Sequence, residues 1–460
     1  MSMSQKSTSI LKILSISIFL LSITYSCDNE TVEIVNTIID TDNDGIAESL
    51  DNCPSIANPD QADADNDGIG NLCDSDFVNS KDPAAICENG FAGIYPCKDY
   101  DLMAHLPINT FNALEGNDSW GWTDSTTGNE YVLLATDANV AFIDITEPTN
   151  PIYLGNVPTE TVSSSWRDVK VYKDHAFIVS EANNHGMQVF DLTRLRNVAN
   201  PPETFTTDAV FTGVGNCHNI VINEQEGFAY LVGCNTFSGG PNFVDITDPK
   251  NPVAAGGYAA DGYSHDAQAI TYNGPDTDYT GKQIYIGSNG STSGTNKVVI
   301  LDVSDKANPQ FIANITYSNS GYAHQGWFTE NQQYFIFGDE LDEQFFGNNT
   351  KTLVFDFSDL DNPTLSSTYF GPTLAIDHNG YVKGNTYYLA NYRAGLRILD
   401  ITNIAASSNA MTEVGYFDTF PSSDSANFNG VWNVYPYFES ENIVISDIEG
   451  GLFIVRKSGT

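Results

Sequence analysis

Two stretches near the N-terminus carry acidic residues at the spacing that wraps a hard divalent cation. The ligand positions are Asp40, Asp42, Asp44, Ile46 and Asp51 in the first stretch and Asp63, Asp65, Asp67, Ile69 and Asp74 in the second. Carboxylates at loop positions 1, 3, 5 and 12 and a main-chain carbonyl at position 7 are typical calcium ligands. Gly45 and Gly68 stand at position 6, where a sharp turn is required. Calcium is therefore the cofactor that we expect.

The charge of this segment supports the same interpretation. Residues 40–76 contain eleven acidic residues and no Lys or Arg. Without a cation these carboxylates repel one another, and the segment has little apolar surface with which to form a core. A solvated acidic linker is the alternative, which the doubled spacing disfavours.

The residues around the loops identify a known type of repeat. No helical pattern flanks the loops, unlike in an EF-hand, and Cys53 follows the first loop while Cys73 ends the second. This arrangement resembles the thrombospondin type 3 repeat, in which calcium organises a coreless chain and a disulfide joins neighbouring loops. The resemblance implies a Cys53–Cys73 disulfide. Ser49 stands where that family often has an acid, which implies weaker binding by the first loop, and we expect dissociation constants of about 10⁻⁴ to 10⁻³ M.

The N-terminus has the features of an export signal. Lys6 and Lys12 precede an apolar run at residues 13–25, which is too short to span a bilayer comfortably. The run ends at Ser26 and Cys27, which resembles a relaxed bacterial lipobox and implies that Cys27 is lipidated after cleavage. Ordinary secretion with cleavage nearby is the alternative. We expect an exported protein at the bacterial outer membrane or cell surface, with the membrane contacted through the lipid.

The cysteine count agrees with export. Seven cysteines less Cys27 leave six, an even number that suits an oxidising compartment. Apart from the Cys53–Cys73 pair implied above, closeness in the sequence is the only reason to expect disulfides between Cys87 and Cys97 and between Cys217 and Cys234. Six cysteines permit fifteen connectivities. The absence of a CxxC pair argues against thiol redox catalysis and thiolate zinc sites.

The charge of the chain excludes one class of partner. The formal net charge is −40, with only 19 Lys and Arg. Phosphate backbones would be repelled, so we expect no nucleic-acid partner.

The rest of the chain is a repeat. An apolar, β-rich run that ends in Asp and leads into a turn recurs at Asp144, Asp191, Asp245, Asp302, Asp356 and Asp400. Successive Asp residues are 44 to 57 residues apart, which suits one four-stranded blade with its loops. A seventh copy at residues 451–455 has Arg456 in place of the Asp. We predict that these aspartates cap turns by accepting backbone hydrogen bonds.

These repeats predict an all-β fold, a seven-bladed β-propeller preceded by the short calcium-binding, disulfide-linked segment. In the fifth blade the expected strands are 326–330, 334–338, 352–357 and 364–370. The last blade lacks an outer strand, which residues 102–108 could supply and so close the ring. An array of β-sandwiches is the alternative, disfavoured because single repeats are too small for independent cores.

Several motifs in this region resemble the choice-of-anchor B family, whose repeats are called LVIVD repeats. They are SHDAQ at 264–268, HQGW at 324–327, DELDE at 339–343, DHNG at 377–380, NYRAGLR at 391–397 and GVWNVYP at 430–436, with a further match at 87–97. The resemblance implies an exported, envelope-attached propeller and implies no reaction.

The expected organisation has five parts. They are a lipoprotein signal peptide at 1–26, a linker at 27–39, calcium-binding repeats at 40–76, a cysteine-containing linker at 77–100 and the propeller at 101–460.

A candidate pocket follows from propeller geometry, because equivalent positions in a closed ring converge on its axis. Residues expected around one mouth are Trp120, Trp166, His218, His265, Asp266, His324, His378, Asp339 and Glu340. The histidines either hydrogen-bond to neighbouring blades as scaffold or hold a transition metal or ligand. The acidic run at 339–343 is either a solvated loop, which we favour, or a further calcium site. Neither HExxH nor GxSxG is present, so no catalytic residue is assigned.

These features lead to two functional hypotheses. The first is a lipid-anchored surface protein whose calcium-binding segment presents a propeller for adhesion to a surface protein or glycan. The alternative is a metal-dependent enzyme with its site at the histidine-lined mouth.

Overall fold

The computed structural model describes residues 40–42, 44–57, 59, 61, 69–70, 73 and 83–460. The chain divides into two compact units, Met1–Val78 and Asn79–Thr460. The expected export signal with Cys27 lies outside the described residues, as do four acids of the second loop: Asp63, Asp65, Asp67 and Asp74.

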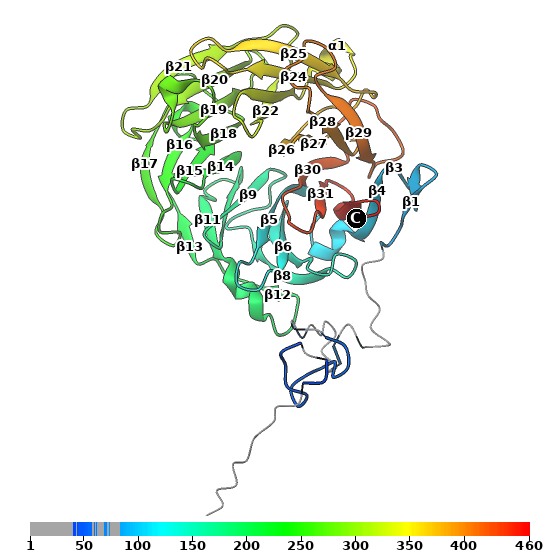
Figure 1. The fold of residues 1–460 in the computed structure, drawn as a ribbon. Helices are drawn as coiled ribbons and strands as arrows, with labels where there is room; N and C mark the ends of the chain where they lie inside the picture. The colour runs from blue at the N-terminus through cyan, green and yellow to red at the C-terminus, as the bar shows by residue number, and fades with distance from the viewer. Residues whose placement is uncertain are drawn as a thin grey trace, which may run out of the picture. The chain divides into compact units, whose positions relative to one another are not determined.

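Residues 83–460 of the second unit form six sheets of four or five strands, together with one larger sheet (Figure 1). The first two comprise β5 (Gly116–Thr123), β6 (Glu130–Thr136), β7 (Asn139–Asp144), β8 (Ile152–Pro158) and β12 (Glu203–Thr204), then β9 (Arg167–Tyr172), β10 (His175–Ser180), β11 (Met187–Asp191) and β13 (Ala209–Phe211). The next two comprise β14 (Asn219–Asn223), β15 (Phe228–Val232), β16 (Asn242–Asp245) and β17 (Val253–Gly257), then β18 (Asp266–Thr271), β19 (Gln283–Asn289), β20 (Lys297–Asp302) and β21 (Gln310–Ile315). The last two comprise β22 (Ala323–Phe328), β23 (Tyr334–Asp339), β24 (Lys351–Asp356) and β25 (Thr364–Phe370), then β30 (Val431–Tyr435), β31 (Ile443–Asp447), β32 (Gly451–Lys457) and β4 (Tyr100–Leu106).

A further sheet has seven strands. It joins β26 (Gly380–Lys383), β27 (Thr386–Ala390), β28 (Leu396–Asp400) and β29 (Thr412–Phe417) to β3 (Tyr95–Lys98), β2 (Phe91–Ala92) and β1 (Cys87–Glu88). Cys97 on β3 pairs with Phe417 on β29. Residues 77–100 therefore differ from the expected linker, because their second half is part of a propeller sheet.

The sheets form a ring. Their inner strands contact one another in the order β5, β9, β14, β18, β22, β26 and β30, and β30 contacts β5 again. The described part of the second unit is thus an all-β propeller with six blades and the extra seven-stranded sheet (Figure 1). Closure of the ring excludes an array of separate sandwiches.

The strand that completes the last blade comes from the start of the ring. β4 pairs antiparallel with β32, with Leu106 opposite Leu452 and Tyr100 opposite Lys457. The sequence predicted this pairing from residues 102–108, two residues further along the chain. Closure leaves β32 with partners on both edges, since β31 pairs with its other side.

Apolar residues between neighbouring sheets form the core. In β6 all seven residues are buried, because both faces of this sheet are covered. Phe142 of β7 stacks on Phe190 of β11 with ring centroids 4.6 Å apart, which joins the first two blades.

The recurring aspartates cap turns, as predicted. Each accepts a hydrogen bond at Oδ1 from the backbone N–H two residues later: Asp144 from Thr146, Asp191 from Thr193, Asp245 from Thr247, Asp302 from Ser304, Asp356 from Ser358 and Asp400 from Thr402. This contact ends the third strand of each of these repeats.

The acidic run at 339–343 is buried, so the expectation of a solvated loop is wrong. It leads into the short helix α1 (Asp342–Phe346), and Asp342 forms an ion pair with Lys351. Glu343 Oε1 accepts the backbone N–H of Lys351 at 2.7 Å. Both side chains are buried.

Other helical elements are short. Four 3₁₀ turns lie at Ile108–Phe111, Leu192–Asn197, Phe237–Gly239 and Thr277–Tyr279. Within the described residues, no helix has the length and apolar character needed to cross a membrane.

Three disulfides are present, and they are the three pairs expected. Cys53–Cys73 belongs to the first unit, and Cys87–Cys97 and Cys217–Cys234 belong to the second. Their Cα–Cα distances are 5.6, 6.0 and 3.9 Å.

Candidate metal centre

The first acidic loop has the local structure of a cation site. Carboxylate oxygens of Asp40, Asp42 and Asp44 lie within 4.8 Å of one another. Gly45 has φ +96°, a conformation that side chains disfavour, and its N–H donates to Asp40 Oδ2 at 3.0 Å. Asp42 Oδ2 is buried and has no hydrogen-bond partner within the described residues. Desolvation raises the pKa of Asp42, as do its acidic neighbours. A calcium ion would satisfy this oxygen and the surrounding charge, so these residues fit the ion.

The closing residue of the loop is tied to the cysteine network. Asp51 Oδ1 accepts the N–H of Cys53 at 2.8 Å and the amide of Gln61 at 3.0 Å. Gly70 donates to the carbonyl of Asn52 at 2.9 Å. Through these bonds and the disulfide, the first loop is connected to Gln61, Gly70 and Cys73. Ile46, at position 7, donates its N–H to Asp44 Oδ1 at 2.8 Å, and Ile69 of the second loop is exposed.

In the propeller, four histidines from successive inner-strand regions form a continuous arc. The ring centroids of His218 and His265 are 4.1 Å apart, those of His265 and His324 are 4.4 Å apart, and those of His324 and His378 are 4.2 Å apart. All four are buried. Imidazoles that the sequence spaces about fifty residues apart are therefore brought together by the ring.

The two ends of the arc are fixed by hydrogen bonds from Nδ1. His218 Nδ1 lies 2.7 Å from Glu181 Oε1, and His378 Nδ1 lies 2.5 Å from the carbonyl of Trp432. A carbonyl or carboxylate oxygen accepts, so Nδ1 carries the proton in both rings and Nε2 of the neutral ring keeps its lone pair. This is the arrangement in which outer partners orient metal-binding imidazoles.

The middle histidines are different. His265 Nδ1 and His324 Nδ1 are both buried without a hydrogen-bond partner. Buried polar atoms are normally paired, so two adjacent exceptions make this part of the arc a candidate ligand site.

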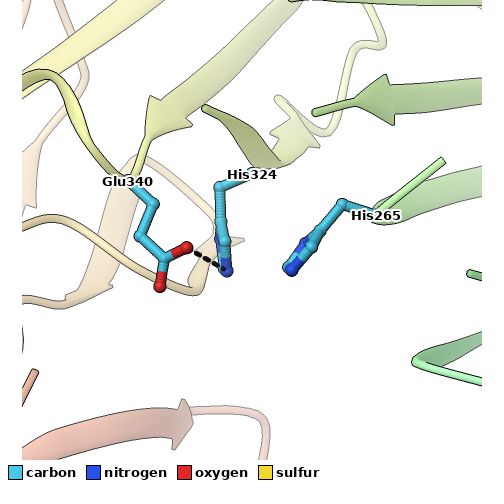
Figure 2. A group of neighbouring side chains, drawn as sticks. All are labelled: His265, His324 and Glu340. Atoms are coloured by element: carbon cyan, nitrogen blue, oxygen red, sulfur yellow. Dashed lines mark ion pairs between the residues drawn. The ribbon is translucent and has the colours of Figure 1, made fainter. Parts of the chain in front are cut away.

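A carboxylate lies beside the arc (Figure 2). Glu340 Oε2 is 3.8 Å from His324 Nε2, and its Oε1 is 3.8 Å from His378 Nε2. Both distances are too long for hydrogen bonds. The hydroxyl of Tyr392 donates to Glu340 Oε1 at 2.8 Å and holds the carboxylate in place. Donor atoms of His265, His324 and Glu340 lie within 4.8 Å of one another.

Burial sets the protonation of this group. It lowers the pKa of His265 and of His324 well below 6.5 and lowers the pKa of His378 to about 3. Burial also raises the pKa of Glu340 to about 7. The three imidazoles are thus neutral at pH 7, which is the form that binds metals.

The arc borders a cavity of about 580 Å³. Its lining includes Trp166, Tyr263, Tyr322, Tyr392, Phe428 and Trp432, together with Glu181, His218, His265 and Glu340. No Lys or Arg belongs to the lining. The cavity is large enough for a small organic molecule beside the histidines.

Of the nine predicted pocket residues, the structure brings six together. Trp166, His218, His265 and Glu340 line the cavity, and His324 and His378 complete the arc. Trp120 does not line it, because this side chain is three residues past the equivalent position in its strand and lies at another cavity.

Two predicted acids also lie elsewhere. Asp266 belongs to a buried group with Asp168 and Lys170, and burial raises its pKa to about 7. Asp339 accepts the N–H groups of Gly321 and Tyr322 and so holds the backbone. These two carboxylates are separate from the arc.

Sequence reasoning missed three partners of the arc: Glu181, Tyr392 and Trp432. Trp432 was detectable from the sequence, because Trp432 and Asn433 occupy the place in β30 that His378 and Asn379 occupy before β26. Glu181 and Tyr392 follow the second strands of their blades, where loops have no regular pattern.

Family models match parts of the chain. The thrombospondin type 3 repeat model matches residues 39–61, and the LVIVD repeat model matches residues 281–316 and 381–419. The chain therefore carries a thrombospondin type 3 repeat near its N-terminus and LVIVD repeats in its propeller. The repeat and the disulfides indicate an extracellular protein. No curated protein matches the sequence.

The chain is similar to solved structures. Hydrazine synthase from Kuenenia stuttgartiensis is similar over 72% of this chain and 93% of its own, with TM-score 0.54 and 11% sequence identity. The Cps50 (Swd1) β-propeller domain of Myceliophteria thermophila is similar over 74% of this chain and 97% of its own, with TM-score 0.47 and 11% identity. At this identity the first similarity shows a propeller fold and says nothing of function.

Proposed function

We propose that the propeller is a metal-dependent enzyme whose transition-metal centre is formed by His265, His324 and Glu340. The observation that carries this proposal is the convergence of their donor atoms within 4.8 Å, with the Nε2 atoms of His324 and His378 each 3.8 Å from the carboxylate of Glu340. A purely structural role for the histidines does not account for a carboxylate that faces two imidazole nitrogens at distances too long for hydrogen bonds.

The distances around Glu340 support a shared ion. Two ligand atoms bound to one ion at about 2.1 Å are at most about 4.2 Å apart. The two 3.8 Å gaps between Glu340 and the imidazoles of His324 and His378 fall within that limit. Donor atoms of His265, His324 and Glu340 lie within 4.8 Å of one another, which makes His265 the third candidate ligand.

The ligand set favours a class of metal. Neutral imidazole with one carboxylate suits zinc, iron, copper or nickel. Such a metal supplies a Lewis acid or a redox centre when bound. The aromatic cavity on the open side of the arc would hold a small organic substrate, and Tyr392 would keep Glu340 oriented.

Elemental analysis of the purified protein tests the proposal. We expect about one equivalent of a transition metal per chain, lost in the His265→Ala/His324→Ala double variant. His175→Ala is the matched control, because His175 lies at a turn beside Asp191 and outside the cavity. Wild-type protein that holds calcium alone after incubation with zinc, iron and copper salts contradicts the proposal.

The proposed setting is the bacterial surface. Lipidation at Cys27 would anchor the chain, and both acidic loops would bind calcium, which the unpaired Asp42 Oδ2 of the first loop supports. If the protein binds calcium in these loops but holds no transition metal, the propeller acts in binding or adhesion. This is the second candidate function. Mass spectrometry of the membrane fraction tests the anchor, and a mature N-terminus without a diacylglyceryl Cys27 contradicts it.

Two finer assignments belong with this proposal. We count β26–β29 as the seventh blade and β1–β3 as its extension, because β26 takes its place among the seven inner strands. We also assign the chain to the choice-of-anchor B family on the motifs around His265, His324 and His378. An experimental structure of the propeller tests both assignments.

A further inference from the structure

A second cavity lies further along the inner strands than the histidine arc. It has a volume of about 310 Å³ and is lined from five inner strands, β5, β9, β14, β18 and β22. Gln268 lines it three residues beyond His265, which is about 10 Å along a strand. The buried carboxylates of Asp118, Asp168 and Asp266 occupy the intervening positions, and the first two face the Nζ atom of Lys170, which lines the second cavity. The two cavities are therefore separate.

One wall of this cavity is aromatic. The indoles of Trp120 and Trp327 line it, and both are half-buried. Each packs edge-on against Tyr381, with ring centroids 5.8 and 4.9 Å apart and planes at 72° and 70°. Tyr435 also packs against Trp120, at 5.1 Å. The indoles are thus held in place before any ligand arrives.

The remaining lining is mostly polar. Glu224 and Gln225, in the turn after β14, have no side-chain hydrogen-bond partner within the described residues. Asn223 and Gln332 add amides that are oriented by bonds to Thr271. The lining therefore offers both donors and acceptors opposite flat apolar surfaces.

The cavity has no cation available for an anionic ligand. Lys170 is its only lysine, and the Nζ atom lies 2.5 Å from Asp168 Oδ1 and 3.6 Å from Asp118 Oδ1. Its charge is committed to these buried carboxylates, while Glu224 and the net charge of −40 repel anions.

We propose that this second cavity binds a neutral sugar. The C–H face of a pyranose packs on an indole, and its hydroxyls both donate to a carboxylate or amide oxygen and accept from an amide N–H. The volume suits one sugar ring with room for its link to a second. This proposal is independent of the metal centre.

Isothermal titration calorimetry with neutral monosaccharides and disaccharides tests the site, and sedimentation with insoluble polysaccharides tests whether the sugar belongs to a polymer. We expect binding that Trp327→Ala weakens at least tenfold, since stacking on an aromatic ring is lost. Because this change could disturb the fold, Glu224→Gln and Gln225→Ala provide exposed alternatives. Each should weaken binding by about two- to tenfold through the loss of a hydrogen bond.

Trp166→Ala is the matched control, because Trp166 is an exposed tryptophan of the histidine cavity. It should leave sugar binding unchanged. The proposal is overturned if no neutral sugar binds at a concentration of 50 mM, which would limit the binding free energy to about 2 kcal/mol. Tighter binding of sulfated or phosphorylated sugars than of neutral ones also overturns it. So does binding that is unchanged in the Trp327→Ala, Glu224→Gln and Gln225→Ala variants.

Discussion

Among the four histidines of the arc, hydrogen bonding divides the rings into two kinds. His218 and His378 are fixed through Nδ1, whereas His265 and His324 have an unpaired Nδ1. A ring held by an outer carboxylate or carbonyl presents Nε2 in a defined direction. The middle rings have no such restraint and are the ones that a bound ion would order.

A buried carboxylic acid near α1 provides a prediction about pH. Burial raises the pKa of Glu343, and the neighbouring Asp377 raises it further. The unfolded chain ionises this group near pH 4.3 while the folded state retains the proton, so stability falls as pH rises above that value. Glu343→Gln removes this penalty. We expect it to raise the free energy of unfolding by about 1–3 kcal/mol at pH 8 and to change it little at pH 4.

Urea denaturation of the wild-type protein and of the Glu343→Gln variant at pH 4, 6 and 8 measures the effect. Glu439→Gln, at an exposed position, is the control and should change nothing. An equal effect of Glu343→Gln at all three pH values would show that the carboxyl is ionised in the folded state.

At this scale the sequence predicted the histidines well and the tryptophans poorly. Histidine is rare here, and its position just before successive inner strands identified the arc. The sequence prediction put Trp120 at the wrong cavity, because each step of one residue along a strand moves the side chain by about 3.3 Å along the ring axis. Asp118, with its side chain bonded to the next N–H as in Asp168 and Asp266, is the residue that sets the register of β5.

At the scale of elements, we expect the acidic repeat to depend on calcium and the propeller to be independent of it. Asp40, Asp42 and Asp44 have no apolar core beneath them, whereas the blades bury continuous apolar strands. We expect a chelator to expose residues 40–76 to proteases while residues 83–460 stay intact. Limited proteolysis with mass spectrometry, with calcium or with EGTA, measures this difference. Equal resistance in both conditions would show that the repeat is stable without the ion.

The Asp caps allow a test of a single turn. Asp400 accepts from the N–H of Thr402 at 2.8 Å and forms no ion pair within the described residues. Asp400→Ala should lower the free energy of unfolding by about 1 kcal/mol, because that N–H loses its partner. Asp400→Asn keeps the acceptor and should cost less than half as much. Thermal or urea unfolding compares the two, and equal losses would assign the effect to charge.

Strand prediction succeeded where a blade had a clear apolar run and a capped turn. In the fifth blade, β25 matches the expected residues 364–370, and β22 begins three residues before the expected 326. The strands β1 and β2 were missed because two residues cannot show an alternating pattern. Their sheet is set by pairing with β29 and by the Cys87–Cys97 bridge.

At the scale of the whole molecule, pairing of β4 with β32 closes the ring. Leu102 and Met103 of β4 are buried against the last blade. A chain that begins at residue 83 should melt like the full-length propeller. A chain that begins at residue 108 exposes the edge of β32, and we expect its Tm to fall by more than about 10 °C, with aggregation.

Size-exclusion chromatography and thermal melts compare the two chains. A chain that begins at residue 99 retains β4 but loses β1–β3, and it separates the effect of losing β1–β3 from that of losing β4. If the chain from residue 108 stays monomeric and melts at the same temperature, β4 is not needed for closure.

The ring itself was predictable because seven related runs and a missing outer strand imply closure. The chemistry along the axis of the ring was not predictable, because it depends on which residues of different inner strands lie at the same level along that axis. The unpaired nitrogens of His265 and His324 become visible only when the four rings are placed side by side.

The last blade unites residues 100–106 with residues 431–457. Its outermost strand, β4, is therefore synthesised more than three hundred residues before its partner strand, β32. During that interval the apolar face of the early strand is open to chaperones or to neighbouring chains. Because β4 pairs with β32, the ring cannot close until the last residues of the chain have been synthesised.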